Sequence, residues 1–144
     1  MLQTYRRFVS LDRTQRRLVV EAAVLMFLGW VGLRLFGFLT LRAVLDHVVA
    51  LTSSRQPAAE ADLVPCVRRA VIAVAARCPG ASCLVQALAA DLMLRRRRLP
   101  CTMRFGVRLT GTTGEPLEGH AWVECGGSTI DAMDGRSAFR VLSR

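Results

Sequence analysis

The stretch that decides the fold is Pro79-Gly80-Ala81-Ser82-Cys83-Leu84-Val85-Gln86-Ala87-Leu88. A Pro-Gly turn precedes a serine that can cap a helix, and the helix then opens with a cysteine in its first turn. Apolar side chains recur at helical spacing through Leu84, Leu88 and Leu92. We therefore predict an apolar helix that begins beside Ser82 and places the Cys83 thiol at the positive end of the helix dipole.

The spacing of apolar residues changes after Leu99-Pro100, which ends this helix. Residues 101–109 alternate between apolar and polar or small side chains, which predicts a half-buried strand. A second strand is expected from about Leu117 to Cys125, a hairpin turn at Gly126-Gly127, and a third strand from Ser128. Helices followed by antiparallel strands predict an α+β fold.

Two helices are expected upstream of a linker. Asp12-Arg13-Thr14-Gln15 resembles a capping box that opens a long helix running toward Phe36, with Gly37 as its stop and Thr40 as the cap of a second helix. The polar stretch 52–61 predicts a linker, and the next helix is expected to start near Pro65. We therefore divide the chain into a helical N-terminal region, residues 1–55, and a core, residues 62–144.

Composition limits the partners. The 144 residues can bury one sizeable core, and the net charge is +9 with arginine at every basic position. Because this bias partly reflects codon composition, we expect no nucleic acid partner, whereas an acidic peptide or an anionic membrane face fits the charge. Ala22 to Leu33 is apolar but Arg34 interrupts it, so we predict a buried or membrane-grazing helix rather than a span of about 20 residues.

The five cysteines predict free thiols. Their number is odd and no secretory signal is recognisable at the N-terminus, so we expect no disulfide framework and a cytoplasmic location, with membrane association as an addition. Cys101 and Cys125 fall on apolar-facing strand positions and are interpreted as core residues, and Cys78 is an alternative redox partner for Cys83. No C-x-x-C spacing occurs, so we predict no metal and no cofactor.

A histidine and an aspartate are predicted to meet on the sheet. If Gly126 and Gly127 form the turn, Cys125 pairs with Ser128, and His120 and Asp131 become diagonal neighbours on one face. Asp134 is the reserve, because a three-residue turn would select it instead. Trp122 shares the His120 face, so it is either a substrate-binding wall or a core residue.

These residues predict acyl transfer to a thiol. The helix terminus and His120 would both lower the pKa of the Cys83 thiol, and Asp131 would orient the imidazole. The Cys83 backbone N–H can contribute to an oxyanion hole, and Gln86, one turn along, is a weaker second donor. The catalytic set predicted from the residues is Cys83, His120 and Asp131.

The pattern resembles the lasso-peptide leader peptidases, a transglutaminase-like cysteine protease family. The similarity rests on Pro79-Gly80-Ala81-Ser82-Cys83-Leu84, Ala87-Leu88-Ala89, the arginine-rich end Arg95-Arg96-Arg97-Arg98, Leu99-Pro100, Phe105-Gly106-Val107-Arg108, His120-Ala121-Trp122-Val123-Glu124 and the N-terminal stretch from Leu11 to Leu18. It covers most of residues 64 to 131.

The resemblance implies a transglutaminase- or papain-like core and cleavage of a leader from a ribosomally made precursor peptide. It also implies a separate leader-recognition protein and an ATP-dependent macrolactam cyclase in the same pathway. Residues 1–60 are predicted to be helical rather than a strand-rich winged module, so the chain resembles the split form of the protease. Two alternatives stay open: a transglutaminase-like acyltransferase or amide hydrolase, and a non-catalytic, basic, membrane-associated binding protein.

Overall fold

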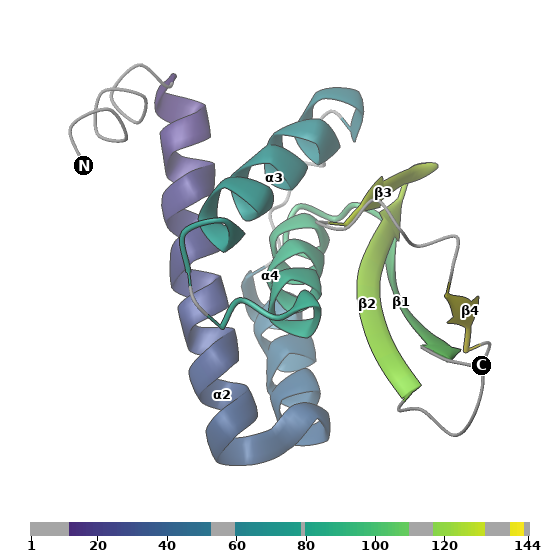
Figure 1. Cartoon of the computed structure of the whole chain (residues 1–144). Coiled ribbons are helices and arrows are strands. Elements are labelled where there is room, and N and C mark those ends of the chain that lie inside the picture. The colour runs from purple at the N-terminus through teal and green to yellow at the C-terminus, as the bar shows by residue number, and fades with distance from the viewer. Residues whose placement is uncertain (1–11, 53–59, 79, 110–116, 132–138, 143–144) are drawn as a thin grey trace.

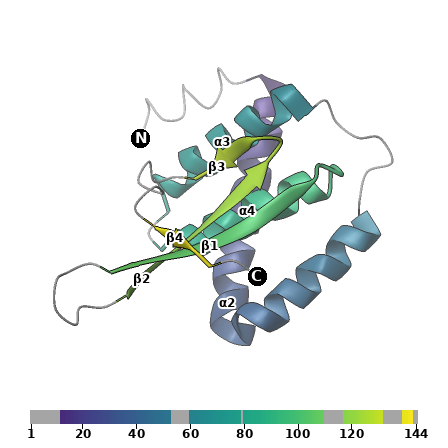
Figure 2. The ribbon, with the colours of Figure 1, turned by 90° about the vertical axis from the view of Figure 1, so that its right-hand side faces the viewer.

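A computed structural model describes residues 12–52, 60–78, 80–109, 117–131 and 139–142 of the chain, and it confirms the α+β class (Figure 1). Figures 1 and 2 show α4 at the centre, with α2 and α3 on one side and the sheet on the other. The elements are α2 (Arg13–Thr52), α3 (Glu60–Ala75), α4 (Cys83–Arg95), β1 (Cys101–Leu109), β2 (Leu117–Cys125), β3 (Ser128–Ile130) and β4 (Arg140–Val141).

Helix α2 bends where the sequence predicted a stop. Gly37 adopts non-helical angles (φ 73°, ψ 174°) that favour glycine, and the chain then runs back beside α4 (Figure 1). A Cβ on Gly32 would lie 2.8 Å from Leu41 Cδ1, so the small residue lets the returning segment pack closely. The predicted break at Gly37 is confirmed, although helix resumes immediately after it.

Helix α3 begins earlier than predicted. It starts at Glu60, so Pro65 lies inside the helix and not in its first turn. A proline inside a helix lacks the N–H and its ring crowds the carbonyl four residues before it, so the first turn of α3 forms without a hydrogen bond from residue 65. The predicted apolar face is confirmed, because four valines are buried there: Val64, Val67, Val71 and Val74.

Helix α4 is buried on nearly all sides and starts where the cap predicted. Ser82 has extended angles, and its side chain accepts a hydrogen bond from Val85 N (3.4 Å). From Val85 onward the helix buries Ala87 and every residue of 88–94. Its burial positions the first turn firmly against the sheet.

The arginines at the end of α4 make ion pairs with α2. Arg97 forms a two-point contact with Glu21 (2.6 and 3.1 Å), and Arg95 reaches Asp46 (2.6 Å). This run was interpreted as a solvated helix end, and that interpretation is wrong for these side chains. The reason is tertiary: the acids they meet lie 49 and 76 residues away in the chain.

Asp91 is a buried carboxyl in the same junction. Only 2% of it is exposed, and Arg42 (2.8 Å) and Arg95 (3.3 Å) contact it. Burial raises the pKa of this carboxyl, and the two guanidinium groups offset only part of the rise. Burial lowers the pKa of Arg95, but Asp46 and Asp91 outweigh that effect and the pKa is raised overall.

The sheet has the strand order β3-β2-β1-β4. The predicted hairpin is confirmed: Cys125 pairs with Ser128, and Gly126 and Gly127 form the turn with positive φ (55° and 75°). Strand β4 was not predicted. It pairs with β1 through Gly106↔Val141, and two residues are too short to give a periodic sequence signal.

The two faces of the sheet have different neighbours. Ala121 and Val123 point toward α4 and belong to the main core. Trp122 points the other way, where a Cβ on Gly106 would lie 3.0 Å from its ring and 2.9 Å from Phe139 Cβ. Glycine at 106 therefore lets these two aromatic side chains pack directly on the strand.

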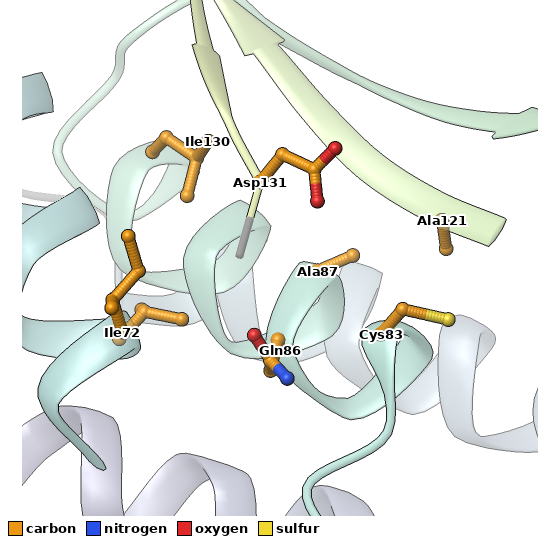
Figure 3. A pocket seen from close by; sticks show the side chains of 8 residues that line it. Ile72, Cys83, Gln86, Ala87, Ala121, Ile130 and Asp131 are labelled. Atoms are coloured by element: carbon orange, nitrogen blue, oxygen red, sulfur yellow. The ribbon is translucent and has the colours of Figure 1, made fainter. Parts of the chain in front are cut away.

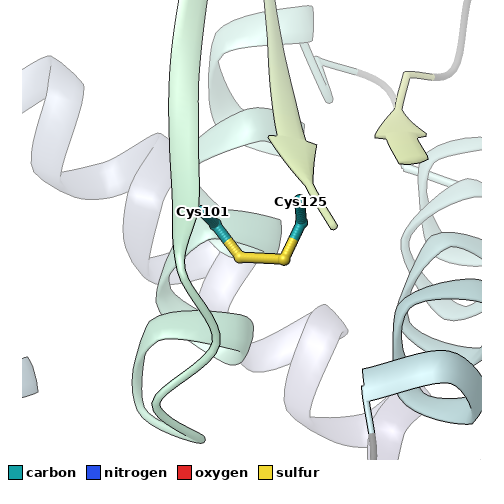
Figure 4. Close-up of a disulfide and its surroundings, with 2 residues drawn as sticks. All are labelled: Cys101 and Cys125. Atoms are coloured by element: carbon teal, nitrogen blue, oxygen red, sulfur yellow. A yellow bond between two sulfur atoms is a disulfide. The ribbon is translucent and has the colours of Figure 1, made fainter. Parts of the chain in front are cut away.

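A disulfide joins Cys101 to Cys125 across the ends of β1 and β2 (Figure 4). The two residues are partners in the strand register, and their Cα atoms are 4.4 Å apart. The expectation that these cysteines are unpaired is therefore wrong, although both do contact the core. Cys66, Cys78 and Cys83 are free, so the alternative Cys78–Cys83 pair is not formed.

Candidate active site

The Cys83 thiol lies at the N-terminal end of α4. No acidic residue occupies the first turn. The amides of Val85 and Gln86 donate to Ser82, which leaves the N–H groups of Cys83 and Leu84 directed out of the helix end. These groups and the helix dipole can stabilise an oxyanion that forms on an acyl group bound to the sulfur.

The thiol approaches β2 one residue before the histidine. Cys83 Sγ lies 3.9 Å from the carbonyl oxygen of Gly119 and donates to it. Figure 3 shows the side chain reaching toward the strand near Ala121. Cys83 also borders a pocket of about 10 Å³, roughly the room of one water molecule. The lining residues are Val71, Ile72, Cys83, Gln86, Ala87, Ala121, Ile130 and Asp131.

His120 and Asp131 are hydrogen-bonded. The Nε2 atom of the imidazole lies 2.8 Å from Asp131 Oδ1, and the two side chains are 2% and 8% exposed. Trp122 and Phe139 enclose the ring, with centroids 5.9 and 5.0 Å away. Because Asp131 engages Nε2, the ring nitrogen that remains for a reacting group is Nδ1.

The structure brings two of the three predicted residues into direct contact. His120 and Asp131 meet as diagonal neighbours in the predicted register. The Cys83 thiol donates to Gly119 and, within the part of the chain that the structure describes, makes no hydrogen bond to the imidazole. Asp131 links the two regions, since it holds the imidazole and also lines the pocket beside the thiol (Figure 3).

The remaining predicted residues have clear positions, with one exception. Trp122 is 3% exposed and donates to Glu124 through Nε1 (3.2 Å), so it supports the His120 ring, and its substrate-binding role stays a prediction. Gln86 donates to the Ala81 carbonyl oxygen (2.7 Å) and braces the loop before the nucleophile. Asp134, the reserve aspartate, lies outside the described residues.

Two neighbours of the site were missed. Phe139 covers the imidazole from the unpredicted strand end, and Ile72 reaches the pocket from α3. The predicted apolar face of α3 did not include Ile72, so the sequence gave no signal for its place at the pocket. Among the residues that the structure describes, no three His, Cys, Asp or Glu side chains lie close enough together to hold a metal ion.

A larger pocket adjoins the loop that leads to Cys83. Its volume is about 290 Å³, and Gly80 stands at its edge with φ 92°, where a Cβ would lie 3.2 Å from Trp30 Nε1. Its walls are Ala23, Met26, Phe27, Trp30, Arg77, Cys78, Gly80 and Ala81. It is mostly apolar, and it lies between α2 and the loop that leads to Cys83.

A family model described as the transglutaminase-like superfamily matches residues 30–144. The chain belongs to the transglutaminase-like superfamily. Searches of curated proteins and of solved structures give no match. The superfamily includes cysteine peptidases and acyltransferases, so membership indicates thiol-based acyl-transfer chemistry.

The superfamily match covers every candidate residue and also part of α2. It begins at residue 30, inside the first helical segment and upstream of the kink. The predicted division into residues 1–55 and 62–144 stays a prediction. Within this transglutaminase-like domain, a cysteine at a helix N-terminus and a His–Asp pair on neighbouring strands form the arrangement from which a function can be argued.

Proposed function

We propose that this chain is a cysteine endopeptidase that removes the leader from a ribosomally made lasso-peptide precursor. The observation that carries the proposal is a buried His120–Asp131 pair, together with a thiol at the N-terminus of α4 that contacts the residue before His120, in a transglutaminase-like domain. The choice of a lasso-peptide precursor rests on the resemblance of residues 64 to 131 to the leader peptidases.

The proposed reaction starts with proton transfer. Asp131 accepts from Nε2–H of His120, which leaves Nδ1 as the base for the Cys83 thiol. In the structure the thiol donates to Gly119 from the α4 side of β2, whereas the imidazole packs on Trp122 and Phe139 on the other face. The reactive state therefore requires a local rearrangement that brings the sulfur and the imidazole together. Such contacts are often loose before substrate binds.

The thiolate then attacks the scissile carbonyl carbon. The C–O π electrons move to oxygen, where the N–H groups of Cys83 and Leu84 stabilise the oxyanion. On collapse the C–N bond breaks, and the His120 imidazolium gives its proton to the departing amine of the core peptide. Water, deprotonated by His120, cleaves the thioester, releases the leader as a carboxylic acid and restores the thiol.

The proposal includes partners and a compartment. The precursor leader peptide is the substrate, and a separate recognition protein would present it, because the described part of the N-terminal region is helical. An ATP-dependent macrolactam cyclase would use the freed core peptide, and the reaction would take place in the cytoplasm. The positive net charge of the chain favours an acidic leader.

The test is cleavage of a synthetic precursor with and without the recognition protein, followed by mass spectrometry. The expected products are the intact leader acid and the core peptide. The Cys83→Ala variant should yield neither, whereas Cys78→Ala, which removes an exposed free thiol, should yield both. Cleavage by Cys83→Ala at the wild-type rate would disprove the assignment of the nucleophile.

Two other functions give different results in the same experiment. A transglutaminase-like acyltransferase would join the acyl group to an added primary amine, so an amide adduct in place of the acid would favour it. A non-catalytic binding protein is favoured by one observation, the contact of the thiol with Gly119 instead of the imidazole. In that case Cys83 would resist alkylation near neutral pH, and no acyl-enzyme would form.

A further inference from the structure

We propose that the outer face of α2 docks on the surface of an anionic lipid bilayer. We define this face by Val20, Val24, Phe27, Leu28 and Leu35. Each of these side chains is at least 50% exposed. Monomeric soluble proteins rarely expose contiguous apolar surface of this kind, and such patches mark interaction sites.

Helical geometry places the patch on one side of α2. Val20, Val24, Phe27, Leu28 and Leu35 fall within one sector at 100° per residue, and the patch runs about 22 Å along the axis. The opposite side holds Leu18, Ala22 and Met26, which are buried in the core. The helix is therefore apolar on both sides, but the packed core covers only one of them.

The charges beside this face favour anionic lipid. Arg13 and Arg17 are exposed seven and three residues before Val20, and Arg34 is exposed within the patch with its guanidinium 4.9 Å from the Trp30 ring. Arginine and tryptophan next to an apolar stripe suit the boundary between lipid headgroups and acyl chains. Each such cation near an anionic surface also adds to the attraction.

The acidic residues of α2 do not oppose that attraction. The helix contains two, Glu21 and Asp46; Glu21 is paired with Arg97, just after α4, and Asp46 with Arg95 of α4. A second copy of the chain would bring the same uncompensated arginines together across the contact. The charge pattern therefore favours a negatively charged surface over self-association.

The fold also distinguishes lying on a membrane from crossing it. The α2 helix has the length and apolarity of a span, with a mean hydropathy of 1.9 over its most apolar window. A span would have to pull Leu18, Ala22 and Met26 away from α3 and α4, which would open the core. Docking through the outer face keeps that packing intact.

The test is sedimentation of the full chain with two kinds of vesicle. One is pure phosphatidylcholine, and the other is an equal mixture of phosphatidylcholine and phosphatidylglycerol. We expect binding to the mixture, little binding to the neutral vesicles, and release in about 1 M salt, where the Debye length is about 3 Å. Equal binding to both vesicles, or no binding to either, would overturn the proposal.

Matched variants locate the contact. Leu28→Ser with Leu35→Ser should weaken binding by at least about tenfold, because two large apolar groups no longer enter the lipid. Val141→Ser with Leu142→Ser removes two similarly exposed apolar groups from the C-terminal strand and should leave binding unchanged. Circular dichroism and thermal melting establish that both variants fold.

Ultracentrifugation without lipid tests the competing occupant. A dimer that dissociates in Leu28→Ser with Leu35→Ser, together with no vesicle binding, would assign the face to a second copy and overturn the proposal. Because no peptide is cleaved in these assays, a failure here is separate from a failure of the peptidase assignment.

Discussion

The two ends of α4 carry opposite chemistry. At the first residue, a thiol and outward-facing N–H groups lie beside β2 with no acid in the turn. At the last turns, arginines pair with acids of α2, and Arg42 reaches Asp91 from the returning segment. The helix dipole favours an anion at the first end and cations at the second. One helix thus has a reactive end, with a thiol at its first residue, and an anchored end, where its last turns form ion pairs with α2.

The sharpest test of this comparison is removal of the thiol. Replacing Cys83 by Ala should lower peptidase turnover by at least about 10³-fold, because no other group forms the thioester. The melting temperature should stay close to that of the wild type, since the side chain is only partly buried. Turnover by mass spectrometry and thermal melting measure the two effects, and a large fall in stability would mean that this end is structural.

The next effect is expected at Asp131. The Asp131→Asn variant should reduce turnover by about 10²–10⁴-fold, since an amide cannot stabilise the imidazolium of His120. The pH–rate profile should change its lower limb, which a merely structural role would leave alone. Glu118→Gln is the control, because Glu118 of β2 pairs with Arg108 of β1 and, among the described residues, makes no hydrogen bond to the imidazole. Unchanged kinetics in Asp131→Asn would remove this residue from the mechanism.

Substitutions at the arginine end of α4 should lower the stability of the protein but leave its turnover unchanged. Arg97→Met leaves Glu21 half-buried without its two-point partner, so unfolding free energy should fall by about 1–3 kcal/mol. Denaturation in urea measures the change, and turnover of the folded fraction should be preserved. Arg98→Met, at an exposed neighbour in the same run, should alter stability by less than about 0.5 kcal/mol. Equal losses in both variants would contradict the pairing.

The smallest effect is a pH dependence from Asp91. Because its folded pKa is raised above the ordinary value of 3.8, the folded chain binds this proton more tightly than the unfolded chain. The stabilising contribution of the group is full below 3.8 and is lost as pH rises through the folded pKa. The stability difference between wild type and Asp91→Asn should therefore fall with rising pH and then level off. A difference that grows with pH would show that the arginines dominate instead.

Local patterns predicted much of the fold and part of the site. The Ser82 cap, the strand predicted from alternation over residues 101–109 and the two-glycine turn depend on neighbours within a few residues, and all three are confirmed. The length of the turn also fixes the register of β3 against β2. That register placed His120 and Asp131 on one face and so predicted their contact. The start of α3 was misjudged because a proline was taken as a boundary, although a helix can extend before it.

Contacts between distant segments could not be predicted in the same way. The pairing of Arg97 with Glu21 and the strand β4 depend on how whole elements pack. The Cys101–Cys125 disulfide depends on the register across a loop, which the odd cysteine count obscured. The direction of the Cys83 thiol toward Gly119 is likewise a result of packing between α4 and β2.

By itself, the sequence determined the elements, the α+β class and the candidate residues Cys83, His120 and Asp131, because caps, periodicity and tight turns are short-range properties of the chain. Only the tertiary structure decided that the acids of α2 neutralise the arginines of α4, and that one apolar side of α2 is left uncovered. Those outcomes depend on which surfaces bury one another, and the free energy of that burial belongs to the packed molecule and not to any single segment.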